Sequence, residues 1–241
     1  MLTKNQIKLI ISLRQKKHRL AQRLFIVEGK KAVGEFLNSN YRLHHLYAIT
    51  DDYAHVNDQF TQISAAELKK ISALTTAQEV LAVFEIPKAK NISSEKLMVA
   101  LDDVRDPGNL GTIIRLCDWY GVEQVICSET TVDCYNPKVV QATMGSLTRV
   151  NISYLDLATF LKNHSNSTYG AFVDGKNVYQ AELPKQGILI MGNEANGITP
   201  EIEPLIKNKI SIPSFSAHQN TESLNVATAT AILLSEFKRR N

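Results

Sequence analysis

Cysteine is scarce in this chain of 241 residues, which contains only Cys117, Cys127 and Cys134. This odd number, with no C-x-x-C pair and no paired histidines at ligand spacing nearby, is typical of reduced thiols and gives no zinc motif. His44 and His45 are adjacent in the sequence, so in a strand their rings would face opposite sides and could not share one ion. We therefore expect no disulfide and no metal site.

Long hydrophobic runs are also lacking. The longest, such as residues 97–101 and 187–191, are far shorter than the roughly 20 residues that cross a bilayer. Polar residues interrupt the first ten positions, which therefore lack the continuous apolar core of a secretion signal. We expect no membrane span and a cytoplasmic location. Hydrophobic residues at 44% and charged residues at 21% are typical of a folded globular chain.

Acidic residues are scarce near the N-terminus. Residues 1–35 contain nine basic side chains but only Glu28 and Glu35 as acids, a net charge of +7 in a chain whose total is +3. A concentrated basic segment is typical of a polyanion-binding site, because each neutralised phosphate releases counterions. The same pattern also fits a solvated helix face, so charge alone leaves nucleic-acid binding and plain solvation open.

A polar linker divides the sequence into two predicted domains. Residues 87–95 (PKAKNISSE) combine proline, lysines and polar residues and interrupt the apolar pattern. We expect a small α/β domain over residues 1–88 and a larger one over residues 95–241. In the first, apolar periodicity predicts helices at 4–13 and 29–37, strands at 24–27, 43–49 and 80–86, and a capping box at Ser64–Glu67 that starts a short helix.

Strands and helices alternate in the second predicted domain, which is typical of a mostly parallel sheet covered by helices on both faces. In such sheets a ligand binds outside the carboxyl ends of the strands. The predicted strands are 97–101, 124–127, 169–173, 188–191 and 209–212, and the predicted helices are 110–120, 137–144, 155–162, 200–207 and 224–239.

The first polar segment at a predicted strand end is residues 106–115 (DPGNLGTIIR). Asn109 is a candidate cap for the following helix, which would carry Arg115 nearly two turns inside it. Taken alone, the segment is explained as a turn followed by an ordinary exposed arginine.

The second polar segment follows the strand 188–191, in the sequence MGNEANGI from residue 191. Glycine at Gly192 allows a backbone to approach a ligand closely, and Gly197 permits a positive φ. The segment matches neither the phosphate loop nor the dinucleotide-binding fingerprint. A plain tight turn is the alternative interpretation.

The third polar segment follows the strand 209–212, where Ile212-Pro213 precedes a polar stretch and then Ser223-Leu224-Asn225. A serine or asparagine in the first turn of the last helix can cap its backbone N–H groups. Capping explains either residue but does not require both.

Taken together and in this order, N-x-G-x-x-x-R (109–115), G-N-E-x-x-G (192–197) and I-P…S-L-N (212–225) resemble the three motifs of the SpoU-type (TrmH-like) RNA 2'-O-ribose methyltransferases of the SPOUT superfamily. Residues 13–37 (LRQKKHRLAQRLFIVEGKKAVGEFL) also resemble the start of the ribosomal-protein-like substrate-binding domain of that family. The resemblance therefore covers nearly the whole chain.

The resemblance implies an α/β trefoil-knot catalytic domain behind a small N-terminal α/β domain that binds RNA. It also implies S-adenosyl-L-methionine as the cofactor and a homodimer with sites near the subunit interface. At the matching positions, the implied cofactor-binding residues are Met191, Gly192, Gly197, Ile212 and Leu224.

The same resemblance puts Arg115 beside the ribose 2'-hydroxyl, as a general base or, because a guanidinium stays protonated, as a group that binds phosphate and stabilises the developing alkoxide. Both roles remain open. The residues implied to orient Arg115, the ribose and the loops are Asn109, Glu194, Ser223 and Asn225. The basic residues expected to bind RNA are Lys16, Lys17, Arg19, Arg23 and Lys30.

One segment departs from the family pattern. The stretch between Pro213 and Ser223 is longer than the usual family loop and lacks its glycine, so the conformation of residues 214–221 is not predicted. His218, within it, is either an added ligand or base or a mobile surface histidine.

The predicted function is methyl transfer from S-adenosylmethionine to a ribose 2'-hydroxyl of structured RNA. Ribosomal RNA is favoured by the type of N-terminal domain. The alternatives are methylation of transfer RNA and a non-catalytic RNA-binding or ribosome-assembly factor of the same fold. A nucleotide-dependent oxidoreductase would need a glycine fingerprint after the first strand of the second domain, where the sequence has DPGNLG instead.

Overall fold

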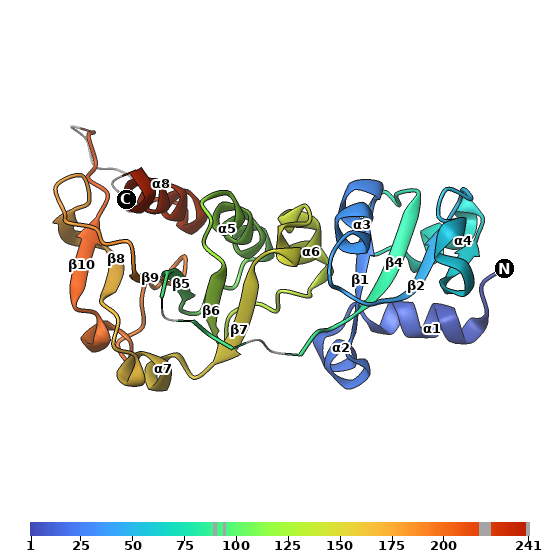
Figure 1. Cartoon of the computed structure of the whole chain (residues 1–241), viewed down its shortest axis with the longest axis horizontal. Coiled ribbons are helices and arrows are strands. Elements are labelled where there is room, and N and C mark those ends of the chain that lie inside the picture. Colours follow the sequence, from blue (N-terminus) through green and yellow to red (C-terminus); the bar gives the residue numbers. More distant parts are fainter. Residues whose placement is uncertain (89–90, 94, 217–222, 240–241) are drawn as a thin grey trace. The chain divides into compact units, whose positions relative to one another are not determined.

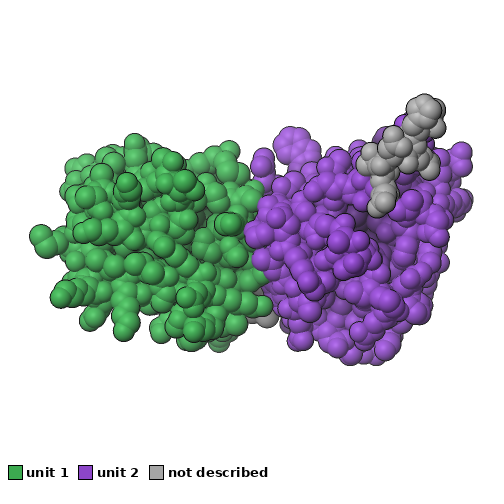
Figure 2. Space-filling view, turned by 180° about the vertical axis from the view of Figure 1, so that it is seen from behind, with its two compact units in different colours: residues 1–89, 133–148 green, residues 90–132, 149–241 purple. Residues whose placement is uncertain are grey.

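A computed structural model describes residues 1–88, 91–93, 95–216 and 223–239 of the chain. The chain forms two compact units, drawn in different colours in Figure 2. Unit 1 comprises residues 1–89 and 133–148, and unit 2 comprises residues 90–132 and 149–241. The segment 133–148 lies inside our predicted second domain but packs in unit 1. The division of the sequence into two domains at the linker stays a prediction.

Unit 1 contains a four-stranded sheet in the order β1-β4-β2-β3, in which only β2 and β3 are parallel. The predicted capping box is confirmed, since Ser64 and Glu67 cap α4 reciprocally. The segment 16–22, expected only as a basic stretch, is helical, and strand β3 was missed. The elements are α1 (Lys4–Ser12), α2 (Lys16–Gln22), β1 (Leu24–Glu28), α3 (Lys30–Leu37), β2 (Leu43–Ala48), η1 (Ala54–Gln59), β3 (Phe60–Gln62), α4 (Ala65–Ile71), β4 (Val80–Glu85), α6 (Pro137–Thr143) and η2 (Ser146–Thr148).

Unit 2 contains a six-stranded sheet in the order β10-β8-β9-β5-β6-β7, with every neighbouring pair parallel. The predicted parallel α/β sheet is therefore confirmed, whereas the trefoil knot stays a prediction. The elements are β5 (Leu97–Leu101), α5 (Pro107–Trp119), β6 (Gln124–Ser128), β7 (Asn151–Leu155), α7 (Leu157–Asn163), β8 (Thr168–Asn177), β9 (Gly187–Met191), η3 (Glu203–Leu205), β10 (Asn208–Ser211) and α8 (Val226–Arg239).

Helices cover both faces of the unit 2 sheet (Figure 1). On one face, α7 packs Leu157 and Leu161 against Met98 and Ile126 of the sheet. Helices α5 and α8 pack against each other on the opposite face. Among the described residues, no helix is long and apolar enough to cross a membrane.

Two predictions for unit 2 were wrong. The helix expected over residues 200–207 is only the short 3₁₀ turn η3, followed by extended backbone at Ile206. Pro204 lies inside this segment and has no N–H to donate to a helical hydrogen bond. The sequence analysis also predicted no strand at residues 151–155, which form β7 and pair in register with β6.

Candidate active site

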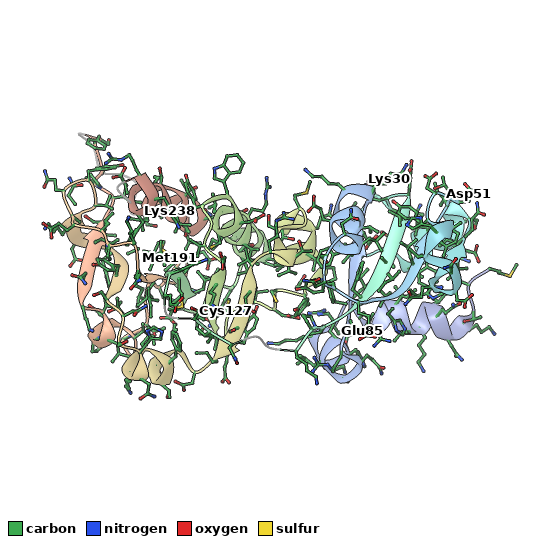
Figure 3. All side chains as sticks on the ribbon, in the orientation of Figure 1. Lys30, Asp51, Glu85, Cys127, Met191 and Lys238 are labelled. Carbon is green, nitrogen blue, oxygen red and sulfur yellow. The ribbon has the colours of Figure 1, made fainter. Side chains whose placement is uncertain are left out.

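The register of the sheet aligns the carboxyl ends of its central strands. Leu101, the last residue of β5, pairs with Met191 at the end of β9 and with Cys127 in β6; Figure 3 labels Met191 and Cys127. The N–H of Asp102 donates to the carbonyl of Met191 at 2.9 Å. The polar segments that follow β5 and β9 therefore leave the sheet side by side, as the sequence predicted.

The loop after β9 closes on itself between two glycines. The backbones of Asn193 and Gly197 exchange hydrogen bonds of 2.8 and 2.9 Å. A Cβ atom at Gly192 would lie 2.2 Å from the carbonyl carbon of Gly197, so only glycine fits there. Gly197 has the expected positive φ, +68°. The close approach at Gly192 is thus made by the protein's own backbone.

Polar residues that the sequence analysis did not single out hold this loop against the one after β5. Asp102 is buried and accepts the N–H of Thr199 at 2.7 Å. The Asn193 side chain donates to the carbonyl of Asp103 at 2.8 Å, and Asp103 forms an ion pair with Arg105. The sequence did contain a signal for these residues, because the acidic stretch DDVRD directly follows the buried strand at residues 97–101.

Helix α5 begins three residues earlier than predicted. Asp106, not Asn109, is its N-cap: the Asp106 carboxylate accepts the N–H of Asn109 at 2.8 Å. Pro107 occupies the first turn, where its missing N–H costs nothing. The side chain of Asn109 is therefore left available for contacts outside the helix.

A chain of hydrogen bonds joins the three motifs. The Asn109 Nδ2 donates to Glu194 Oε1 at 2.9 Å, and Asn225 Nδ2 donates to Asn109 Oδ1 at 2.9 Å. Asn225 also caps α8, because its Oδ1 accepts the N–H groups of Ala227 at 2.9 Å and Thr228 at 3.2 Å. Three side chains separated by up to 116 positions thus form one network, which we call the asparagine–glutamate network (Asn109, Glu194 and Asn225).

Two of the predicted catalytic residues lie outside this network. Arg115 is exposed on α5, and its side chain forms no hydrogen bond or ion pair within the described part of the chain. Ser223 is exposed and, as far as the described ranges extend, does not bond to the network. Within the described residues, no side-chain hydrogen bond joins Asn109 or Glu194 to Arg115, and their expected role in orienting it stays a prediction.

The five predicted cofactor-binding residues lie at the end of a strand, in the segment that follows a strand, or just before a helix of unit 2. Met191 is buried, Gly192 and Ile212 are half-buried, and Gly197 is exposed. Leu224 is 48% exposed just before α8. Apolar side chains and loop backbone thus occur together at the carboxyl edge of the sheet.

The predicted RNA-binding residues divide into two groups. Lys16, Lys17, Arg23 and Lys30 are exposed, with Lys30 paired to Glu79. Arg19 differs, because its side chain is only 2% exposed and bonds to Asp133 through Nε at 2.9 Å and Nη2 at 2.5 Å.

The remaining Arg19 nitrogen, Nη1, donates to the carbonyls of Leu13 and Arg14, each at 2.9 Å. With its donors used inside unit 1, Arg19 holds the fold together and is not available to phosphate. Including Arg19 among the RNA-binding residues was therefore wrong. Its charge in a basic stretch gave no indication of its burial.

The three cysteines, which we expected to be reduced thiols, take no part in this site. Cys117, Cys127 and Cys134 are free and buried, and burial raises the pKa of the Cys127 thiol to about 12. No group of three potential metal ligands is found among the residues that the structure describes. His218 lies outside the described residues.

Comparison with known proteins identifies two matching family models. The SpoU rRNA Methylase family matches residues 96–235, and the MRM3-like substrate binding domain matches residues 4–82. A curated relative, the 23S rRNA (guanosine(2553)-2'-O)-methyltransferase RlmP of Bacillus subtilis, is 31% identical over 236 residues, which cover 94% of this chain and 93% of the relative.

Solved structures give the same result. A TrmH-family structure from Porphyromonas gingivalis is 40% identical, with a TM-score of 0.90 and full coverage of both chains. An AdoMet-bound rRNA methyltransferase from Sinorhizobium meliloti is 29% identical, with a TM-score of 0.88 over 100% of this chain and 96% of that one. The three motifs, the parallel sheet and these matches agree, and the chain belongs to the SpoU rRNA methylase family.

Proposed function

We propose that this protein transfers the methyl group of S-adenosylmethionine to a ribose 2'-hydroxyl of ribosomal RNA. The observation that carries the proposal is the asparagine–glutamate network, which ties together the three family motifs at the carboxyl edge of the sheet. The Bacillus subtilis relative, matched over nearly its whole length, is named for 2'-O-methylation of a guanosine in 23S rRNA. Ribosomal RNA is therefore the substrate class we favour over transfer RNA, and the cytoplasm is the location we propose.

The residues at the carboxyl edge fit S-adenosylmethionine. Leu224 and Ile212 supply apolar surface that is still accessible, which suits the flat adenine ring. At the two ends of the loop, Gly192 and Gly197 present backbone groups that no side chain covers from their own position. Bound there, S-adenosylmethionine would supply an activated methyl group on a sulfonium. The role of the protein is then to hold the ribose oxygen in line with that methyl group.

We assign Arg115 an electrostatic role in preference to that of a general base. Its exposed guanidinium is cationic in water and has no proton-accepting nitrogen. A planar group that carries a permanent positive charge can bind an RNA phosphate through two parallel hydrogen bonds. It can also stabilise the negative charge that develops on the 2'-oxygen as the hydroxyl proton passes to solvent water and the methyl group leaves the sulfur. The network residues Asn109, Glu194 and Asn225 would fix the loops on which the ribose rests.

The proposed RNA-binding surface of unit 1 consists of Lys16, Lys17, Arg23 and Lys30, which are exposed in and around α2 and at the start of α3.

We further propose that the protein is a homodimer. In support, Trp119 on α5 is 84% exposed, and burial of this ring against a second copy would remove a large apolar area from water. Trp119→Ala should then lower the mass measured by light scattering to that of a monomer.

The experiment is a transfer assay with radiolabelled S-adenosylmethionine and, separately, unmodified ribosomal and transfer RNA. We expect label on a 2'-O-methylated nucleotide of the ribosomal RNA. Arg115→Ala should bind S-adenosylmethionine with unchanged affinity yet lose transfer. Label on transfer RNA alone would show that the substrate is transfer RNA and not ribosomal RNA. Cofactor binding without transfer to either RNA would indicate a non-catalytic RNA-binding factor.

A further inference from the structure

Two aromatic side chains form an exposed pair in unit 2 that the proposed chemistry does not use. The ring centroids of Tyr179 and Phe215 lie 6.4 Å apart, and their planes are inclined by 30°. Phe215 is 86% exposed and Tyr179 is 39% exposed. A phenylalanine ring this exposed does not gain the free energy that burial of such a ring normally provides. Their pairing distinguishes them from single apolar residues scattered over a surface.

Backbone pairing fixes the position of Tyr179 and the start of the segment that carries Phe215. Asn177 and Ser211, the last residues of β8 and β10, pair with each other, and the N–H of Val178 donates to the carbonyl of Ser211 at 2.9 Å. The N–H of Tyr179 donates to the Asn177 side chain at 2.9 Å. The aromatic pair is therefore built on two joined strand ends, four residues after Ser211 in the case of Phe215.

The strand register puts this pair at the edge of the sheet that carries the candidate active site. Lys209, Gly170 and Ile190 pair across three parallel strands, so the end of β10 lies level with the end of β9 at Met191. Strand β9 separates β8 from β5, the strand that leads into Asn109. With neighbouring strands about 4.8 Å apart, β8 is roughly 10 Å from β5.

We propose that Tyr179 and Phe215 form a stacking platform for an unpaired RNA base close to the methylated nucleotide. The proposal rests on the proposed function, which brings RNA to this edge. Proteins that recognise unpaired nucleotides stack the bases on exposed aromatic rings, and a ring face accepts any base. Lys176, which is exposed on the same strand three residues before Tyr179, supplies a positive charge of the kind that attracts an RNA backbone.

The test compares substitutions of Phe215 in the full-length protein, with unmodified 23S rRNA as the substrate. Phe215→Ala should raise the KM for RNA about ten-fold, in line with the loss of one stacked base, with kcat and the Kd of S-adenosylmethionine unchanged. Phe215→Trp should retain the wild-type KM, whereas Phe215→Leu, which is apolar without a π face, should behave like Phe215→Ala. Val173→Ala is the matched control, since Val173 is 81% exposed on β8 and has no ring.

A binding measurement makes the test independent of turnover. A short single-stranded RNA that carries 2-aminopurine should lose fluorescence on binding to the wild type and to Phe215→Trp, but not to Phe215→Ala. An unchanged KM and unchanged quenching in Phe215→Ala would overturn the platform while leaving the methyltransferase intact. Weaker cofactor binding would assign the rings to the cofactor site instead, and a change from dimer to monomer would assign them to a partner copy. Absence of transfer by the wild type would refute the proposed function itself.

Discussion

Glu67 illustrates how one side chain can serve two parts of unit 1. Its carboxylate accepts the N–H of Ser64 at 3.0 Å, which caps α4, and the N–H of Leu2 at 2.8 Å, which holds the N-terminus. These backbone hydrogen bonds lower the pKa of Glu67 to about 2. An acid whose pKa is lower in the folded than in the unfolded chain stabilises the fold above its ordinary pKa of about 4.5. That contribution is lost as the pH falls towards about 2.

Glu67→Gln should therefore unfold at a lower temperature than the wild type at pH 7, because a neutral amide binds the two N–H groups less strongly. The difference in Tm should shrink as the pH is lowered from 5 to 3. Thermal unfolding followed by circular dichroism across this range checks it, with Glu201→Gln, at an exposed position, as the control. A difference in Tm that does not depend on pH would contradict the assignment.

The same glycine-to-alanine change should have opposite effects at two positions. At Gly192 the new Cβ would lie 2.2 Å from backbone, so the loop would have to open and methyl transfer should be lost. At Gly34, inside α3, a Cβ meets nothing within 4 Å, and alanine should stabilise the protein by about 0.5–1 kcal/mol. Urea unfolding and transfer assays on both variants provide the comparison. Normal transfer by Gly192→Ala would refute the steric argument.

At the scale of the helix, Asn225 has two functions that can be separated. Asn225→Asp keeps an oxygen that accepts the N–H groups at the start of α8, and a negative charge there is favourable. It loses the Nδ2 that donates to Asn109. We expect wild-type stability with reduced transfer for Asn225→Asp, whereas Asn225→Ala should in addition lose about 1 kcal/mol with the cap. Equal rates of methyl transfer by the wild type and Asn225→Asp would show that the hydrogen bond between Asn225 and Asn109 does not contribute to the reaction.

Much of the element order follows from local sequence, and the exceptions have physical causes. The strand ends at Leu101 and Met191 could be located because apolar runs stop there and glycine or acidic residues follow. The N-cap at Asp106 was missed because Asp106 and Asn109 are both good caps and only the structure separates them. The aromatic pair could not be foreseen, since Tyr179 and Phe215 meet only through the pairing of β8 with β10.

At the scale of the whole molecule, the ion pair between Arg19 and Asp133 joins residues 114 positions apart. Its two side chains are 2% and 11% exposed. Removing one member of a buried pair leaves an uncompensated charge and costs about 3–5 kcal/mol. Arg19→Ala should therefore markedly lower the free energy of unfolding. Lys17→Ala should leave that free energy unchanged but weaken RNA binding and reduce its dependence on salt.

Chemical unfolding and RNA titrations at several salt concentrations distinguish these two variants. Charge counting along the chain treats Arg19 and Lys17 as equivalent, because both lie in the same basic stretch. The structure separates them, because Arg19 is buried and bonded to Asp133 whereas Lys17 is exposed. If Arg19→Ala were as stable as Lys17→Ala and impaired only in RNA binding, the original assignment of Arg19 to the RNA surface would be restored.

The packing of residues 133–148 in unit 1 also sets an order of events during synthesis. Asp133 neutralises the buried Arg19, and the ring of Tyr135 lies with its centroid 4.7 Å from that of Phe25 in β1. A nascent chain that ends near residue 94 has neither. The N-terminal unit therefore cannot complete its core until about 50 further residues, including β5, α5 and β6, have left the ribosome. The first part of the protein to be made is among the last to be finished.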